Sequence, residues 1–151
     1  MGNARLGLKY AFLSLDLIKI PVKFAIQINS SPWHGQTCES AYQFIRAAIR
    51  LGHEIVRVFF YYDGAYNGFR WMSSSEAGQT AIRRWSLLAV EEGVDLAICI
   101  SAAQRRGLLE QSEASRLGKQ DDDLAEGFRI AGLGLWVEAC LKADRLLVFG
   151  E

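Results

Sequence analysis

The sequence has few of the residues that form disulfide cross-links or bind metal ions in small domains. Among 151 residues there are three cysteines, two histidines and two prolines. Three cysteines cannot all pair within one chain and none lies in a Cys-x-x-Cys arrangement, so the pattern indicates free thiols in a reducing compartment, the cytoplasm. The small number of histidines and the absence of metal-ligand spacing argue against a structural zinc site. Any chemistry is therefore expected to involve a thiol.

Net charge is also missing, since 17 basic residues balance 17 acidic ones. This balance removes the broad basic field with which nucleic-acid binders neutralise phosphates, so direct nucleic-acid binding is not expected. Long hydrophobic runs are absent as well. The apolar stretch near the N-terminus is interrupted by Asp16 and Lys19 and is followed by no small-residue cleavage site, so neither a membrane span nor a secretory signal is expected. The remaining composition is that of one soluble domain.

From residue 22 onward the patterns of strands and helices alternate. Apolar runs bounded by turn formers predict strands over residues 22–28, 53–62, 94–100 and 146–149. Helical spacing predicts helices over residues 41–51, 76–92, 101–107, 109–118 and 133–141. The second strand is too apolar to have one wet face and is expected to be central. These elements predict a single-domain, three-layer α/β sandwich with a mostly parallel sheet, flavodoxin-like in general form.

In parallel sheets, ligands collect outside the carboxyl ends of the strands. Residues 29–38, 63–71 and 99–107 follow the first three predicted strands and are expected at that edge. No glycine pattern in them matches a phosphate loop, and the short repeat Gly132–Gly134 stands beside a helix and not after a clear strand. A nucleotide is therefore not expected. No other cofactor and no metal ion is expected either.

Cys99 is the strongest candidate for chemistry. It ends an apolar strand just before a helix, where backbone N–H groups and the helix dipole favour an anion. Arg105 and Arg106 follow within two turns and are candidates for stabilising a thiolate, which is the reactive form of cysteine. The alternative is that Cys99 fills a buried strand position, as free cysteines often do.

Four other side chains have weaker claims. Cys38, near the start of the first helix, is either a second thiol at the same edge or a small space filler. Cys140 lies on the apolar face of the last helix, which favours packing. His34 is either an acid or base beside the site or a solvated loop residue, and the latter is favoured. His53 begins a strand at the opposite end of the sheet and is expected to be structural.

Two loops carry a conspicuous composition. The segment 63–76 presents Tyr66, Phe69 and Trp71, which either contact a partner or fold back over the sheet. The acidic run 121–123 is typical of a solvated surface.

Six ordered blocks give the chain a family resemblance. They read VKFAIQIN, SAYQFIRAAIRLGHEIVRVFFYYDGAYN, AICISAAQRRG, EASRLGK, FRIAGLG and ADRLLVFGE. Together they resemble the DsrE/TusD-like sulfur-relay family and cover the chain from Val22 to Glu151. The resemblance implies a cytoplasmic sulfurtransferase subunit that carries sulfur as a cysteine persulfide. It assigns that role to Cys99, whereas Cys38 and Cys140 inherit none.

The resemblance also implies partners. Members of this kind assemble with two smaller related subunits into a hetero-hexamer. They receive sulfur from an upstream persulfide donor and pass it to a small carrier protein with a mobile C-terminal cysteine. In one branch the sulfur reaches 2-thiouridine at the wobble position of tRNA, and in the other it belongs to sulfur oxidation. No direct contact with nucleic acid or membrane is implied.

Residues 1–21 have no counterpart in this resemblance, because family members commonly begin at Met-Lys-Phe-Ala. Here the corresponding block begins at Val22. A GTG start codon that is read internally gives valine, so we hypothesise that translation begins at Val22. We therefore expect residues 1–21 to be an appendage and possible gene-start artefact, with the domain over residues 22–151. An intact mass that retains Met1 or Gly2 would contradict this hypothesis.

Two other functions stay open at this point. The subunit is alternatively a non-catalytic scaffold of a hetero-oligomeric relay complex, with Cys99 as core packing. A flavin-binding module of flavodoxin type is the third interpretation, but the sequence offers it no phosphate loop.

Overall fold

The structure, a computed structural model, describes residues 20–34, 36–71 and 76–150. Most of the expected appendage therefore lies outside the described residues. The strands are β1 (Lys23–Ile28), β2 (Glu54–Phe60), β3 (Leu96–Cys99), β4 (Phe128–Ala131) and β5 (Arg145–Phe149). The helices are α1 (Thr37–Arg50), the 3₁₀ helix η1 (Tyr62–Gly68), α2 (Glu76–Glu92), α3 (Ile100–Arg105), α4 (Gln111–Arg116) and α5 (Leu133–Lys142).

One five-stranded sheet forms the middle layer, with the strand order β4-β3-β2-β1-β5. Each neighbouring pair is parallel, as the long helical connections predicted. The α/β class with a mostly parallel sheet is thereby confirmed, and β2 is the central strand. The order differs from the 2-1-3-4-5 order of flavodoxin-like sheets, because the chain adds three strands in one direction before β5 returns beside β1.

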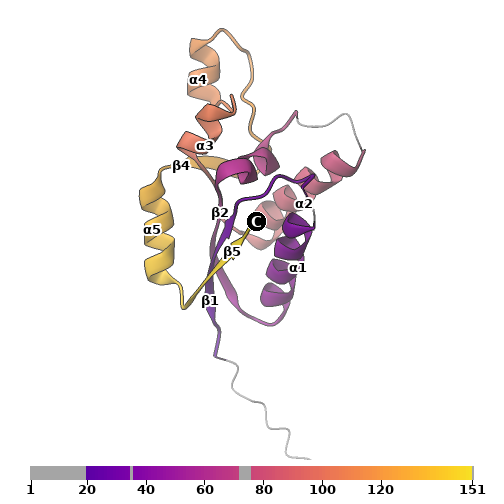
Figure 1. The fold of residues 1–151 in the computed structure, drawn as a ribbon, viewed down its shortest axis with the longest axis vertical. Coiled ribbons are helices and arrows are strands. Elements are labelled where there is room, and N and C mark those ends of the chain that lie inside the picture. The colour runs from indigo at the N-terminus through magenta and orange to yellow at the C-terminus, as the bar shows by residue number, and fades with distance from the viewer. Residues whose placement is uncertain (1–19, 35, 72–75, 151) are drawn as a thin grey trace, which may run out of the picture.

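The direction of these crossovers decides which helix covers which face. Right-handed connections that advance from β1 to β3 place α1 and α2 on one face, and the return from β4 to β5 places α5 on the other. Figure 1 shows this arrangement, with α1 and α2 together on one side of the sheet and α5 on the other. On one face Phe60 packs edge-on against Trp85 of α2, and on the other Phe59 stacks on Trp136 of α5.

Two elements differ from the sequence prediction. The strand β4 was not expected, because its four residues, FRIA, are too few to show alternation. It is nevertheless fixed in place, since Arg129 forms an ion pair with Asp95 beside the start of β3. Part of the expected loop 63–76 is the helix η1, which is held by hydrogen bonds of the buried Asn67.

The acidic run 121–123 is only partly solvated. Asp123 is buried, and its carboxylate accepts hydrogen bonds from the backbone N–H of Leu109 and from Lys119. Asp122 accepts a hydrogen bond from Arg70 at 2.7 Å. The expectation of a fully solvated surface is therefore wrong for these two carboxylates, which fasten the loop before β4 to its neighbours.

Candidate functional site

Cys99 is the last residue of β3 and the residue immediately before α3. It lies opposite Ala131, the last residue of β4, and its side chain is 3% exposed. Alternation along β3 places Cys99 on the same sheet face as Ala97 and its neighbour Phe59, the face that α5 covers. The thiol thus stands at the carboxyl edge of the sheet, nearly covered by the elements that begin there.

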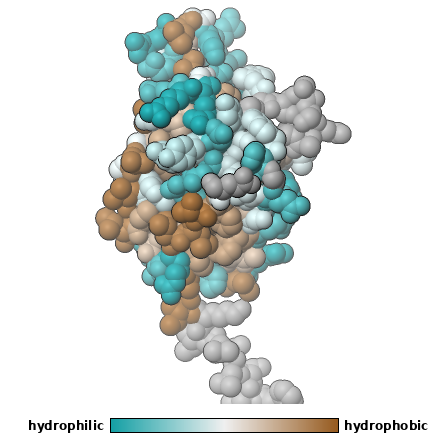
Figure 2. Space-filling view, viewed as in Figure 1, coloured by the Kyte–Doolittle hydropathy of each residue, from teal (hydrophilic) through white to brown (hydrophobic). Residues whose placement is uncertain are grey.

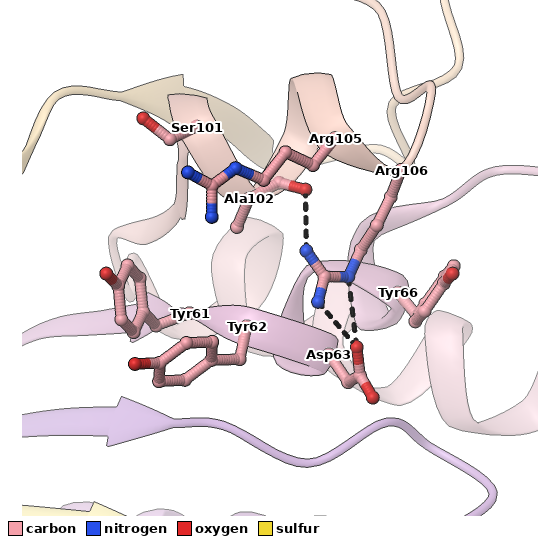
Figure 3. A pocket seen from close by; sticks show the side chains of 8 residues that line it. All are labelled: Tyr61, Tyr62, Asp63, Tyr66, Ser101, Ala102, Arg105 and Arg106. Carbon is pink, nitrogen blue, oxygen red and sulfur yellow. Dashed lines mark hydrogen bonds and ion pairs between the residues drawn. The ribbon is translucent and has the colours of Figure 1, made fainter.

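A polar cavity of about 440 Å³ lies at the same edge of the sheet, and Cys99 is not itself part of its lining. Its walls come from the end of β2, from η1 and from α3, and are formed by Tyr61, Tyr62, Asp63, Tyr66, Ser101, Ala102, Arg105 and Arg106. Tyr61 follows Phe60, the partner of Ile98, so the register carried one step further sets Tyr61 beside Cys99. Ser101 and Ala102 are the second and third residues after Cys99 in the chain. We call this space the tyrosine-arginine cavity (Figure 3).

The two arginines expected to act on a thiolate have different surroundings. Arg105 and Arg106 stand at the carboxyl end of α3, about 9 Å along the helix axis from its start. Arg106 donates two hydrogen bonds to Asp63 and a third to the carbonyl of Ala102. Arg105 has no hydrogen-bond or ion-pair partner in the part of the chain that the structure describes. In Figure 3 its guanidinium extends along the cavity toward Ser101, above Tyr61 and Tyr62.

A second cavity, of about 340 Å³, continues the first along the sheet edge. Asn29, Ser30, Ser31 and His34 line it together with Tyr62, Asp63 and Arg106, which both cavities share. His34 is therefore placed at the carboxyl edge, exposed, as the sequence led us to expect. Tyr62 is one of the side chains that line both cavities, and no pattern in the sequence had pointed to it.

Tyr62 has an unusual backbone conformation. Its φ is 45°, in the left-handed region that a bulky aromatic residue rarely adopts. The flanking hydrogen bonds fix it there: the N–H of Tyr61 donates to Ile28, and the N–H of Gly64 donates to Asn29. Strained residues of this kind cluster at functional sites.

Cys38 belongs to a buried polar network on the other side of the edge. Its Sγ donates to the carbonyls of Ser30, at 3.1 Å, and Ser31, at 3.4 Å. The fully buried Asn67 donates to Sγ of Cys38 and accepts a hydrogen bond from Nε1 of Trp85. Burial raises the pKa of the Cys38 thiol, against the opposing effect of the Asn67 hydrogen bond. No pattern in the sequence pointed to Asn67, which resembles an ordinary turn residue before Gly68.

Other sequence candidates lie apart from the cavity. Cys140 is half-buried on α5, and desolvation raises the pKa of its thiol. His53 accepts a hydrogen bond from the backbone N–H of Val22 and contacts Phe24 edge-on, which fits the structural role expected of it.

The sequence left open whether the aromatic residues of segment 63–76 contact a partner or fold back over the sheet, and these residues differ in their surroundings. Tyr66 packs on Trp33 and Phe69, so these rings fold back onto the domain. Trp71 is 67% exposed.

Within the described residues, no three histidine, cysteine or carboxylate side chains are grouped so that they would hold a metal ion. None of the helices in that part of the chain is long and apolar enough to cross a membrane.

Comparison with known proteins agrees with this arrangement. The model of the DsrE/DsrF-like family matches residues 22–149. A protein of Allochromatium vinosum named "Putative sulfurtransferase DsrE" is 48% identical over 130 residues, which are 86% of this chain and all of that protein. The crystal structure of the YchN protein from E. coli superposes with a TM-score of 0.65 at 19% identity, over 85% of this chain and 99% of that one. The likeness to YchN shows the fold alone. The family match and the A. vinosum relative show more: the chain belongs to the DsrE/DsrF-like family.

Proposed function

We propose that this protein is a cytoplasmic sulfurtransferase subunit that carries sulfane sulfur as a persulfide on Cys99 and passes it to a small carrier protein with a C-terminal cysteine. The observation that carries the proposal is the position of Cys99 at the carboxyl edge of β3, immediately before the helix whose Ser101 and Ala102 line the tyrosine-arginine cavity. Cys38 donates to two carbonyl oxygens within a buried network, and Cys140 lies on α5. Cys99 is the thiol best placed to exchange sulfur with a ligand at this edge.

The chemistry consists of two thiol exchanges. The Cys99 thiolate attacks the outer sulfur of a donor persulfide, R–S–SH, forming Cys99–S–SH and releasing R–S⁻. The carrier thiolate then attacks the outer sulfur, takes it, and releases the Cys99 thiolate. A sulfur–sulfur bond breaks as another forms in each step, so no net oxidant or reductant is needed. The outer sulfur lies about 2 Å beyond Sγ, so the persulfide reaches further from the covered Cys99 position than the thiol does.

A large exposed apolar surface supports assembly with other subunits. Five aliphatic side chains on α5 and β5 are each more than half exposed: Leu133, Val137, Leu141, Leu146 and Val148. Figure 2 shows apolar side chains gathered over this side of the molecule. Contiguous patches of this kind are typical of protein interfaces. We infer that this surface, the α5-β5 patch, joins the subunit to two smaller related subunits in a hetero-hexamer.

The decisive experiment is mass spectrometry of the intact complex after incubation with a persulfide donor. After digestion, we expect the peptide that contains Cys99 to be heavier by one sulfur atom. This added mass is expected to be absent in Cys99→Ser. Cys38→Ser and Cys140→Ser are the matched controls and are expected to keep the modification. Transfer to the carrier that continues unchanged in the Cys99→Ser complex would instead establish the scaffold function.

The destination of the sulfur is a separate question. The two candidates are 2-thiouridine synthesis at the tRNA wobble position and oxidation of reduced sulfur. Deletion of the gene separates them, because loss of 2-thiouridine from bulk tRNA assigns the first role and loss of sulfur oxidation with intact tRNA assigns the second.

A further inference from the structure

The tyrosine-arginine cavity has the size of a small-ligand site. Its volume of about 440 Å³ falls within the range of about 300–1,000 Å³ that is typical of pockets for small molecules. A folded domain cannot enter a space of that size, whereas a small molecule or the last few residues of a polypeptide can. A ligand of that size in the cavity would lie against Ser101 and Ala102, in the helix that follows Cys99.

The charges of the cavity select the kind of ligand. Asp63 and Arg106 neutralise each other, with Nη2 of Arg106 2.6 Å from Oδ1 of Asp63. Arg105 has no such partner among the described residues, and its guanidinium extends over the cavity (Figure 3). The walls thus present one uncompensated positive charge, together with the hydroxyl groups of Ser101 and the tyrosines. A single carboxylate matches this set, because a guanidinium binds carboxylates through two parallel hydrogen bonds.

Tyr62 supplies an independent observation. The fold holds this residue in the left-handed region, and its side chain is 57% exposed between the two cavities. A ring displayed in this way is suited to packing against the uncharged body of a bound molecule. Strain of this kind is kept only where the surrounding structure imposes it.

We propose that the tyrosine-arginine cavity binds a carboxylate that belongs to a cysteine-like thiol or persulfide, with Arg105 holding the carboxylate and Cys99 exchanging sulfur with the ligand. This proposal rests on the proposed function for its sulfur step, but its binding step stands by itself. The ligand chemistry has two possible sources: a free amino-acid thiol, or a cysteine near the carboxyl terminus of a polypeptide. In either case R–S–SH and the Cys99 thiolate yield Cys99–S–SH and R–S⁻, or the reverse.

Binding is measured by NMR titration of the full-length Cys99→Ser protein, in which no sulfur is transferred. The probes are N-acetylcysteine against its uncharged amide, and the peptide Ala-Ala-Ala-Cys-Gly against the same peptide with an amidated terminus. We expect the carboxylate form of at least one pair to bind about ten- to a hundredfold more tightly than its uncharged counterpart, as charged hydrogen bonds usually give. A preference confined to N-acetylcysteine assigns the free thiol, and one confined to the peptide assigns a polypeptide terminus.

Three variants test the assignment of residues. Arg105→Gln is expected to abolish the carboxylate preference, whereas the matched control Arg116→Gln on α4 leaves it unchanged. Tyr62→Ala is expected to weaken both members of a pair by the same factor, because the ring contacts the uncharged part of the ligand. Equal affinity of acid and amide in both pairs, or a preference that survives in Arg105→Gln, overturns the proposal. If the acid binds as expected but Cys99 accepts sulfur from no donor, the sulfur-transfer function fails and the carboxylate site stands.

Discussion

Arg106 donates hydrogen bonds to one carboxylate oxygen of Asp63 through both Nε, at 3.1 Å, and Nη2, at 2.6 Å. Its Nη1 donates to the carbonyl of Ala102 at 3.1 Å, so the pair ties η1 to the helix that follows Cys99. Its neighbour Arg105 is left to face the cavity. Two adjacent arginines that look equivalent in the sequence therefore have different surroundings: Arg106 is bound to Asp63 and Ala102, and Arg105 faces the cavity.

Replacing Asp63 with asparagine is expected to release the charge of Arg106 into the cavity. Asp63 is mostly exposed, so the free energy of unfolding is expected to fall by no more than about 1 kcal/mol. The affinity for N-acetylcysteine, measured by NMR in the Cys99→Ser background, is expected to rise a few-fold because the cavity gains a positive charge. A decrease in affinity at unchanged stability would contradict this view of the cavity charges.

Asp95 joins three strands and is expected to matter for stability. It accepts hydrogen bonds from Arg57 of β2 at 2.6 Å and from Arg129 of β4 at 2.8 Å, at the start of β3. Asp95→Asn is expected to lower the free energy of unfolding by about 1–3 kcal/mol, because the largely buried Arg57 loses its nearer counter-charge and retains only Glu138, at 3.7 Å. Urea denaturation measures this. The control is Glu113→Gln, which breaks an exposed pair with Arg116 and is expected to cost less than about 0.5 kcal/mol.

The same carboxylate predicts a pH dependence. Burial alone would raise the pKa of Asp95, but the hydrogen bonds and charges of Arg129 and Arg57 outweigh burial and hold the pKa below its usual range. A carboxyl whose pKa is lower in the folded state stabilises the protein above its unfolded pKa, about 3.9, and loses this contribution as the pH falls through the folded value. Below about pH 4, the free energy of unfolding, measured by urea denaturation at several pH values, is expected to fall less steeply with decreasing pH for Asp95→Asn than for the unmodified protein. Parallel pH profiles of the two would refute this linkage.

The side-chain amide of Asn67 is expected to contribute strongly to the free energy of unfolding. Asn67→Leu keeps the volume but removes the partners of Nε1 of Trp85 and of the carbonyls of Ser30 and Gly64. Leaving buried polar groups unpaired is expected to cost about 1–3 kcal/mol, readable in urea denaturation. The exposed Gln43 on α1 offers a matched control, since Gln43→Leu removes only a surface hydrogen bond to Glu39 and is expected to change stability by less than about 0.5 kcal/mol.

Two glycines give a matched test of the packing between β1 and η1. A Cβ at Gly64 would lie 2.0 Å from the backbone oxygen of Ile28, whereas a Cβ at Gly134 on α5 meets nothing within 4 Å. Gly64→Ala is therefore expected to destabilise by about 2 kcal/mol or more, because the obstacle is backbone. Gly134→Ala is expected to be neutral or to stabilise by up to about 1 kcal/mol, as alanine favours the helix. Thermal denaturation compares the two, and equal melting temperatures would show that η1 yields to the new methyl group.

Much of the fold was predictable because its signals are local. The apolar run that became β2 was expected to be central, and β2 is the third of five strands in the sheet. The helices predicted over residues 41–51 and 76–92 are each followed by a glycine, and both Gly52 and Gly93 have the positive φ that a helix-ending residue favours, 82° and 68°. The strand β4 escaped prediction because its four residues are defined by the Arg129–Asp95 pair across strands, which no local period records.

The same distinction between local signals and contacts across the fold applies to the candidate site. The sequence by itself determined that a thiol, Cys99, ends a strand before a helix with two arginines nearby, because apolar period and helix signals depend on neighbours in the chain. Only the tertiary structure decided that Arg106 pairs with Asp63 while Arg105 faces the cavity, and that Tyr62 is held at a positive φ beside them. The physical reason is distance along the chain. Asp63 and Arg106 are 43 residues apart and meet only because parallel strands bring their carboxyl ends to one edge of the sheet.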